Sequence, residues 1–185
     1  MPELDADPDQ RAVARVLAGE RNAFRILYER HYSRVYSVIR GIVRREVDAE
    51  DLTQDTFTLA FKSLRQFDQR SKFGTWLFRI AVNRALAHAR RKGGRHDVDL
   101  TVIENHAVAP LETPTASDPR IENALAKLSA DDRALLILFY WEEQTLTDIA
   151  HVLGSTANAV KTRLFRARER FRRLYEGLPA EDELV

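Results

Sequence analysis

Apolar residues recur at helical spacing through most of the chain, in two stretches separated by a segment rich in glycine and proline. The first stretch covers residues 8–92, and helical spacing resumes at Ile121 and continues to about Tyr175. β-branched residues nowhere alternate as they do in a strand, and no Asn-Gly or Asp-Gly hairpin turn occurs. The pattern predicts an all-α protein of two small helical domains, at 8–92 and 120–176, joined by an extended linker over 93–119.

The C-terminal stretch has the pattern of a helix-turn-helix. Thr145 and Asp148 have the spacing of a capping box that opens a short helix, and Gly154 ends that helix. Thr156 can cap a second helix, on which apolar residues repeat every three or four positions: Val160, Leu164, Ala167, Phe171 and Leu174. Two helices around a tight turn are the unit that many proteins dock in the DNA major groove.

Seven cations and a single acid lie between positions 161 and 173 of this second helix. Exposed side chains early in such a helix reach base edges, and the candidates are Lys161, Thr162 and Arg166. Side chains at the turn and beside it bind phosphates, and the candidates are Ser155, Thr156 and Arg163. A solvated charged face is the simpler alternative, but the order of cap, short helix, glycine turn and basic helix favours DNA.

A second basic segment runs from Gln69 to His96, where no acid occurs. Its cations are Arg70, Lys72, Arg79, Arg84, Arg90, Arg91, Lys92 and Arg95, and aromatic residues accompany its start: Phe67, Phe73, Trp76 and Phe78. Aromatic faces beside cations bind unstacked bases, with about 1–3 kcal/mol per stacked base. The segment therefore indicates contact with melted DNA. Helical spacing through Trp76 and Ile80 leaves a second interpretation, in which at least half of these aromatics are core residues.

An acidic helix is predicted just before this segment, from about Ala49 to Phe67. Phe57 and Phe61 share one face with other apolar residues, whereas Asp51, Gln54 and Asp55 share another. Helix N-termini favour acids in any protein, which is the simpler explanation. Acids on a DNA-binding protein repel phosphate, so this face is also a candidate surface for a protein partner.

Composition narrows the remaining classes of function. Net charge is only +1, so the argument for nucleic acid depends on how the charge is distributed. The chain has no cysteine, and no stretch approaches the roughly 20 apolar residues that span a bilayer, so we expect a cytoplasmic protein without membrane insertion. The five histidines lack metal-ligand spacing and no phosphate-binding glycine loop occurs, so we expect no metal, no cofactor and no enzyme.

Three segments in order resemble the signatures of extracytoplasmic-function (ECF) sigma factors: AEDLTQDTFTLAFKSLRQF, FGTWLFRIAVNRA and LTDIAHVLGSTANAVKTRLFRARERFR. AFRILYERHYSRVY also fits the first helix of that family, so the resemblance covers roughly Ala12 to Tyr175. One departure is Asn158-Ala159, where relatives commonly place a glycine and a hydroxyl residue.

The resemblance implies a subunit that directs RNA polymerase to promoters. Asp51, Gln54 and Asp55 would contact the clamp coiled coil of the largest polymerase subunit, and the C-terminal domain the flap region. The loop Phe67–Phe73 and Asn83 would bind a flipped base of the minus-10 strand. Its neighbours on that surface would be Arg70, Lys72, Trp76, Arg79 and Arg84. Phe165 would join Lys161, Thr162 and Arg166 at the minus-35 duplex.

The resemblance also implies that the acidic linker threads toward the polymerase active-site cleft, and that an anti-sigma factor is a possible further partner. A stand-alone helix-turn-helix regulator is the alternative function, although it leaves the first basic and aromatic segment without a role. Transcription that requires both this protein and core polymerase would separate the two hypotheses.

Overall fold

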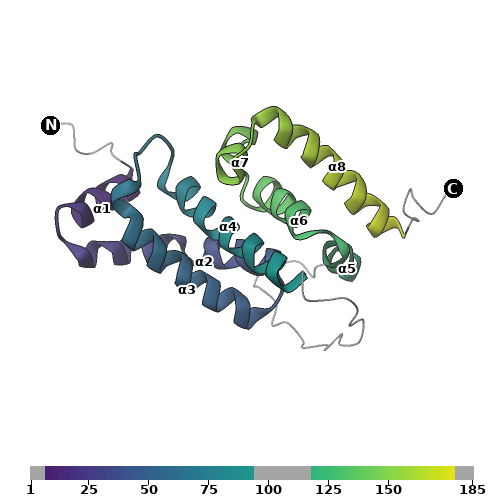
Figure 1. The fold of residues 1–185 in the computed structure, drawn as a ribbon, viewed down its shortest axis with the longest axis horizontal. Helices are drawn as coiled ribbons and strands as arrows, with labels where there is room; N and C mark the ends of the chain where they lie inside the picture. The colour runs from purple at the N-terminus through teal and green to yellow at the C-terminus, as the bar shows by residue number, and fades with distance from the viewer. Residues whose placement is uncertain (1–6, 94–117, 178–185) are drawn as a thin grey trace.

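The computed structural model describes residues 7–93 and 118–177, and every element within these ranges is helical (Figure 1). The N-terminal half contains α1 (Pro8–Leu17), η1 (Arg21–Ala23), α2 (Phe24–Val43), α3 (Glu46–Ser63), η2 (Leu64–Gln66) and α4 (Phe73–Gly93). The C-terminal half contains α5 (Pro119–Lys127), α6 (Ala130–Leu136), η3 (Ile137–Trp141), α7 (Leu146–Leu153) and α8 (Ala157–Glu176). The all-α prediction is confirmed. Most of the predicted linker, with its acids Asp97, Asp99, Glu104 and Glu112, lies outside the described residues.

The acidic helix begins earlier than its sequence pattern indicates. Arg44 adopts a left-handed conformation, with φ of 66°, and ends α2. The chain therefore turns at once, and α3 begins at Glu46 rather than at the predicted Ala49. Glu46 and Asp48 lie in its first turn, where negative charge is favourable next to the helix dipole.

The predicted helix-turn-helix is confirmed in its local detail. The Thr145 hydroxyl accepts a hydrogen bond from the Asp148 backbone N–H at 3.1 Å and donates one to the Asp148 carboxylate at 2.6 Å. Gly154 ends α7 in a left-handed conformation, with φ of 60°, that costs glycine little. Thr156 then caps α8 by accepting from the Ala159 N–H at 3.2 Å. Local sequence signals are therefore enough to define this motif.

The N-terminal half is a bundle in which α2, α3 and α4 pack on one another and α1 lies against α2. Val35 and Ile39 of α2 and Leu77 of α4 have no exposed surface. Complete burial of an aliphatic side chain contributes about 1.5–3 kcal/mol. The amphipathic faces predicted from helical spacing therefore meet in one core. None of the described helices has the length and apolar character that crossing a membrane requires.

The two halves also pack directly on each other, with α4 against α7 and α2 against α6 (Figure 1). Gly41 permits the close approach of η3, because a Cβ at that position would lie 2.5 Å from Cδ1 of Ile137. Arg133 donates to the Ile42 carbonyl at 2.8 Å, near the C-terminus of α2, and so satisfies a carbonyl that has no partner within its helix. The sequence had indicated two domains on a tether, and it contained no sign of this contact.

One ion pair across the contact joins a buried acid to a half-exposed arginine. Arg34 of α2 lies 2.8 Å from Glu142, whose side chain is only 7% exposed. The Arg34 guanidinium also lies over the ring of Phe78 in α4, 5.5 Å from its centroid. The pair therefore ties the segment before α7 to both α2 and α4.

Candidate nucleic-acid interface

The loop between η2 and α4 begins and ends on buried aromatic rings. Phe67 is 5% exposed and Phe73 is 1% exposed, and their ring centroids lie 5.7 Å apart in an edge-to-face arrangement. Trp76 packs against both rings, at 5.3 Å and 5.7 Å. In this conformation neither Phe67 nor Phe73 offers a free face to a base, because both rings are already packed. Both rings support the loop here, and their predicted contact with a base stays a prediction.

The tip of the loop is polar and exposed. Gln69 has a left-handed backbone, with φ of 58°, and the Arg70 backbone N–H donates to the Asp68 carboxylate at 3.1 Å. The side chains of Arg70 and Lys72 are exposed. The loop thus exposes two cations to solvent, next to the packed rings of Phe67, Phe73 and Trp76.

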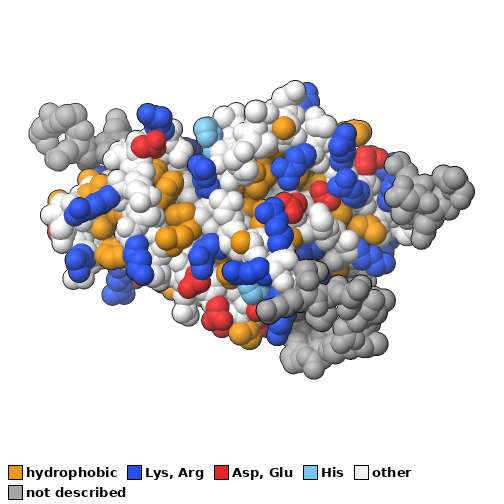
Figure 2. Space-filling model, in the orientation of Figure 1, with side chains coloured by type: hydrophobic (Ala, Val, Ile, Leu, Met, Phe, Trp, Pro, Cys, Tyr) orange, Lys and Arg blue, Asp and Glu red, His pale blue; other side chains and the backbone are white. Residues whose placement is uncertain are grey.

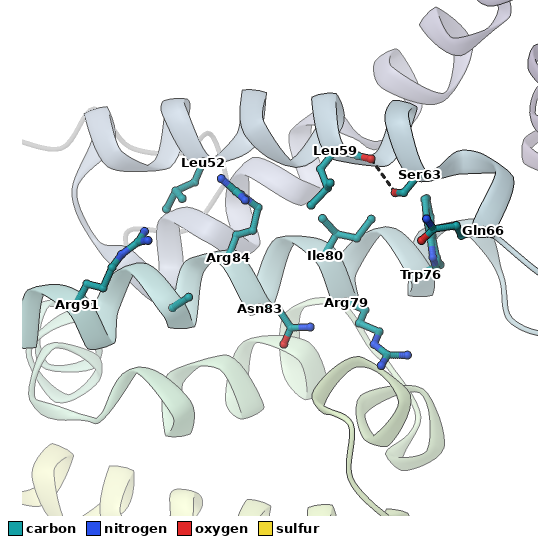
Figure 3. Close-up of a pocket in the computed structure, with 11 residues that line it drawn as sticks. Leu52, Leu59, Ser63, Gln66, Trp76, Arg79, Ile80, Asn83, Arg84 and Arg91 are labelled. Carbon is teal, nitrogen blue, oxygen red and sulfur yellow. Dashed lines mark hydrogen bonds between the residues drawn. The ribbon is translucent and has the colours of Figure 1, made fainter.

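A groove of about 450 Å³ lies between α3 and α4 next to this loop (Figure 3). Figure 3 shows Leu59 and Ile80 between the helices, with Trp76 beside Gln66 at one end. Its lining includes four residues of the predicted minus-10 surface: Trp76, Arg79, Asn83 and Arg84. The volume lies within the range of roughly 300–1,000 Å³ that is typical of ligand sites. We call this feature the α3–α4 groove.

Gln66 lines the same groove, and sequence reasoning missed it. Its side chain can both donate and accept hydrogen bonds, as base recognition requires. Its position immediately before the predicted loop was the available signal.

Asp55 and Arg84 form an ion pair between α3 and α4. The family resemblance implied a polymerase surface for Asp55 and a DNA surface for Arg84. The structure brings the two side chains together, because α3 and α4 are neighbours in the bundle. Asp51 and Gln54 remain exposed, without a hydrogen bond or ion pair in the part of the chain that the structure describes.

Asp48 forms a second link between these helices. It lies 2.6 Å from the Lys92 ammonium and 3.4 Å from Nε2 of His88. Burial opposes ionisation of Asp48, but its hydrogen bond to Lys92 and the nearby positive charges outweigh burial and lower the pKa of this carboxyl. Acids of α3 thus neutralise cations near the C-terminus of α4, whereas Arg79 makes no ion pair within the described ranges.

The structure divides the cations of α8 into two groups. Arg163, Arg170 and Arg172 lie 3.8 Å, 2.6 Å and 3.3 Å from Asp131, Asp132 and Glu169 respectively. Lys161 and Arg166 are exposed and have no such partner among the residues that the structure describes. The predicted base-contacting side chains are therefore available, while several of the other arginines serve the fold.

The remaining predicted minus-35 residues lie around the N-terminus of α8. Phe165 is 65% exposed, and Thr162 is exposed beside it on the helix, with its hydroxyl donating to the Asn158 carbonyl at 3.2 Å. Thr156 uses its hydroxyl oxygen as the helix cap, which leaves the hydroxyl proton able to donate to a phosphate. Ser155 is half-buried. Figure 2 shows Lys and Arg side chains along α8 and over the middle of the same face, with isolated acids between them.

Comparison with known families defines the class of protein. Residues 27–95 match sigma-70 region 2, and residues 119–171 match sigma-70 region 4. Region 2 thus covers most of the N-terminal bundle with the loop and groove, and region 4 covers the helix-turn-helix. The fold is that of an RNA polymerase sigma factor, and both candidate DNA surfaces lie within the matched regions.

Individual relatives identify the group within that class. The RNA polymerase sigma-H factor of Pseudomonas aeruginosa is 31% identical over 90% of this chain and 93% of its own length. The ECF sigma factor SigM of Mycobacterium tuberculosis H37Rv is 31% identical over 90% of this chain and 84% of its own. This chain therefore belongs to the ECF group of the sigma-70 family.

Solved structures agree with this assignment. CnrH, in complex with the cytosolic domain of CnrY, matches with a TM-score of 0.68 and 26% identity over 92% of this chain and 99% of that chain. The sigma factor RpoE of Bartonella quintana, in complex with the anti-sigma factor NepR, matches with a TM-score of 0.69 and 28% identity over 83% of this chain and 96% of that chain.

Proposed function

We propose that this sigma factor recognises promoters through two separate surfaces. The loop 67–73 and the α3–α4 groove would bind the melted minus-10 strand, and the N-terminal part of α8 would read the minus-35 duplex. The observation that carries the proposal is the lining of the groove, which includes Trp76 near the loop and Arg79 and Asn83 along α4 (Figure 3). A stacking ring, a cation and an amide are the groups that an extruded base requires.

The exposed face of α3 is the proposed docking surface for core RNA polymerase. Asp51 and Gln54 point to solvent there, and the largest-subunit clamp coiled coil is the proposed partner. The C-terminal half would contact the flap region. Because RpoE of B. quintana was solved with an anti-sigma factor, a protein of that class is a further proposed partner. With these partners the protein would act in the cytoplasm, as a recognition subunit without catalytic activity of its own.

Run-off transcription from a promoter library, with core polymerase, tests the proposal. Trp76→Ala and Asn83→Ala should abolish promoter opening, while binding to core polymerase is retained. The double variant Lys161→Ala, Arg166→Ala should weaken recognition of the minus-35 duplex and leave minus-10 opening unchanged. If core polymerase yields no transcripts from the library, while the protein alone binds duplex DNA tightly, a stand-alone regulator is the better explanation.

The polymerase surface needs its own variant. Reversal of Asp55 would also remove the partner of Arg84 in the groove, so Asp51→Lys is the cleaner change. Glu29→Lys, an equal charge reversal at an exposed acid of α2, is the matched control. Weaker binding to core polymerase for Asp51→Lys but not for Glu29→Lys would support docking through α3.

A further inference from the structure

A buried acid of α1 contacts a buried histidine of α2. Asp9 is 6% exposed, and its Oδ2 lies 2.7 Å from Nε2 of His31, which is itself 7% exposed. The other oxygen of Asp9 accepts from Nε of Arg30 at 2.8 Å, and the Arg30 side chain is 48% exposed. A carboxylate is expensive to bury unless its oxygens are paired, so His31 and Arg30 together permit its position.

His31 in turn supports the start of α4. Its ring lies 5.4 Å from the ring of Phe73 in an edge-to-face arrangement. A Cβ at Gly74 would lie 3.3 Å from Cε1 of His31, so the imidazole packs closely against the backbone there. Nδ1 of His31 is buried and has no hydrogen-bond partner among the described residues. Within those residues, the bond between Nε2 and Asp9 is therefore the only hydrogen bond of the imidazole. The orientation of the ring therefore depends on Asp9.

The contacts continue from Phe73 to the proposed minus-10 site. Phe73 packs against Phe67 at the other end of the loop, and both rings pack against Trp76, which lines the α3–α4 groove. A contiguous series of contacts thus joins α1 to the groove through His31, Phe73 and Trp76. Helix α1 also lies against η2, the turn that leads into Phe67.

We propose that Asp9 and His31 are positioning residues for capture of the minus-10 strand, an inference that rests on the proposed function. They touch no DNA. Asp9 fixes the His31 ring, the ring fixes Phe73, and Phe73 with Phe67 holds the loop and Trp76 in the conformation that accepts a base. Helix α1, which lies outside the matched region 2 segment, is on this interpretation part of the promoter-opening machinery.

The test uses holoenzyme assembled from core polymerase and the full chain, with a fork-junction DNA that carries 2-aminopurine in its minus-10 strand. Asp9→Ala should weaken binding of this probe by roughly 2- to 30-fold, the range expected for changes at coupled residues that do not touch the ligand. Asp9→Asn keeps an oxygen that can accept from Nε2 of His31, so it should restore most of the affinity. Arg30→Ala removes the half-exposed partner of the same carboxylate, and because water can take its place there while His31 keeps its own bond to Asp9, the affinity should be unchanged.

Two further measurements separate positioning from general loss of structure. Each variant is compared with the natural sequence in its affinity for core polymerase and in its circular dichroism, and both should be unchanged. A loss of probe binding that is shared by Asp9→Asn, or accompanied by equal loss of core binding, would overturn the proposal. The proposal would also be overturned if Asp9→Ala binds the probe normally while Trp76→Ala does not bind it. If Trp76→Ala also binds normally, the proposed minus-10 site itself is wrong, and the positioning role fails with it.

Discussion

Gly41→Ala tests the contact between the two halves of the protein. Alanine is the better helix former, and at a site without neighbours it would stabilise α2 by about 0.5–1 kcal/mol. In this structure the new methyl group would lie 2.5 Å from Cδ1 of Ile137 in η3. Cδ1 is the end of a side chain, but Ile137 is buried and has little room to move aside. Overpacking of this kind costs about 1–3 kcal/mol, so we expect a net loss of up to about 2 kcal/mol.

Ile137→Val makes the prediction specific to the contact. It removes the carbon that the new methyl group would meet, and the next nearest atom, Cγ1 of Ile137, lies at 3.4 Å, which is close to ordinary van der Waals contact. Alone this change should cost about 0.5–1.5 kcal/mol, as Ile→Val changes in cores do. In its presence Gly41→Ala should become neutral or stabilising, which gives a favourable coupling energy of about 1–3 kcal/mol.

Urea unfolding of the four proteins measures the coupling. Circular dichroism follows the unfolding of all helices. Tryptophan fluorescence follows both halves, because Trp76 lies in the N-terminal half and Trp141 in the C-terminal half. Coincident transitions are required before free energies are compared. Effects that add to within about 0.5 kcal/mol would refute the reasoning, because they would show that residues 41 and 137 do not touch in solution.

Three further predictions concern single side chains. Thr145→Ala removes the cap of α7 and should lower the free energy of unfolding by about 1 kcal/mol, measured by urea denaturation; an unchanged midpoint would contradict the capping role. Lys161→Ala should reduce the slope of log affinity for the minus-35 duplex against log salt concentration by about one counterion. Arg170→Ala, at a cation already paired with Asp132, should leave this slope unchanged. Equal slopes for the two variants would exclude Lys161 from the interface. Asp48→Asn should destabilise the protein at neutral pH, because Lys92 holds the pKa of Asp48 below its usual value of 3.8. That difference should persist above pH 3.8 and disappear as the pH falls through the lower pKa of the folded protein, measured as thermal stability against pH; a difference that grows in acid would contradict the pairing.

Much of the candidate site could be predicted from sequence, since Trp76, Arg79, Asn83 and Arg84 do line one groove. For the loop, the sequence left two interpretations of the aromatic residues open, contact with a base or a place in the core. The structure packs the rings of Phe67 and Phe73 together. Hydrophobic periodicity marks aromatic residues as apolar, yet it does not tell a ring that stacks on a base from one that stacks on its neighbour.

The sequence by itself determined the helices, the helix-turn-helix and the separation of basic and acidic segments. These features depend on caps, glycine conformation and helical spacing, which act within a few residues. Only the tertiary structure decided that Asp55 pairs with Arg84, that Asp9 reaches His31, and that Arg34 meets Glu142 across the two halves. Such pairs join helices whose mutual packing is a property of the whole core, and no local pattern along the chain specifies which charges it brings together.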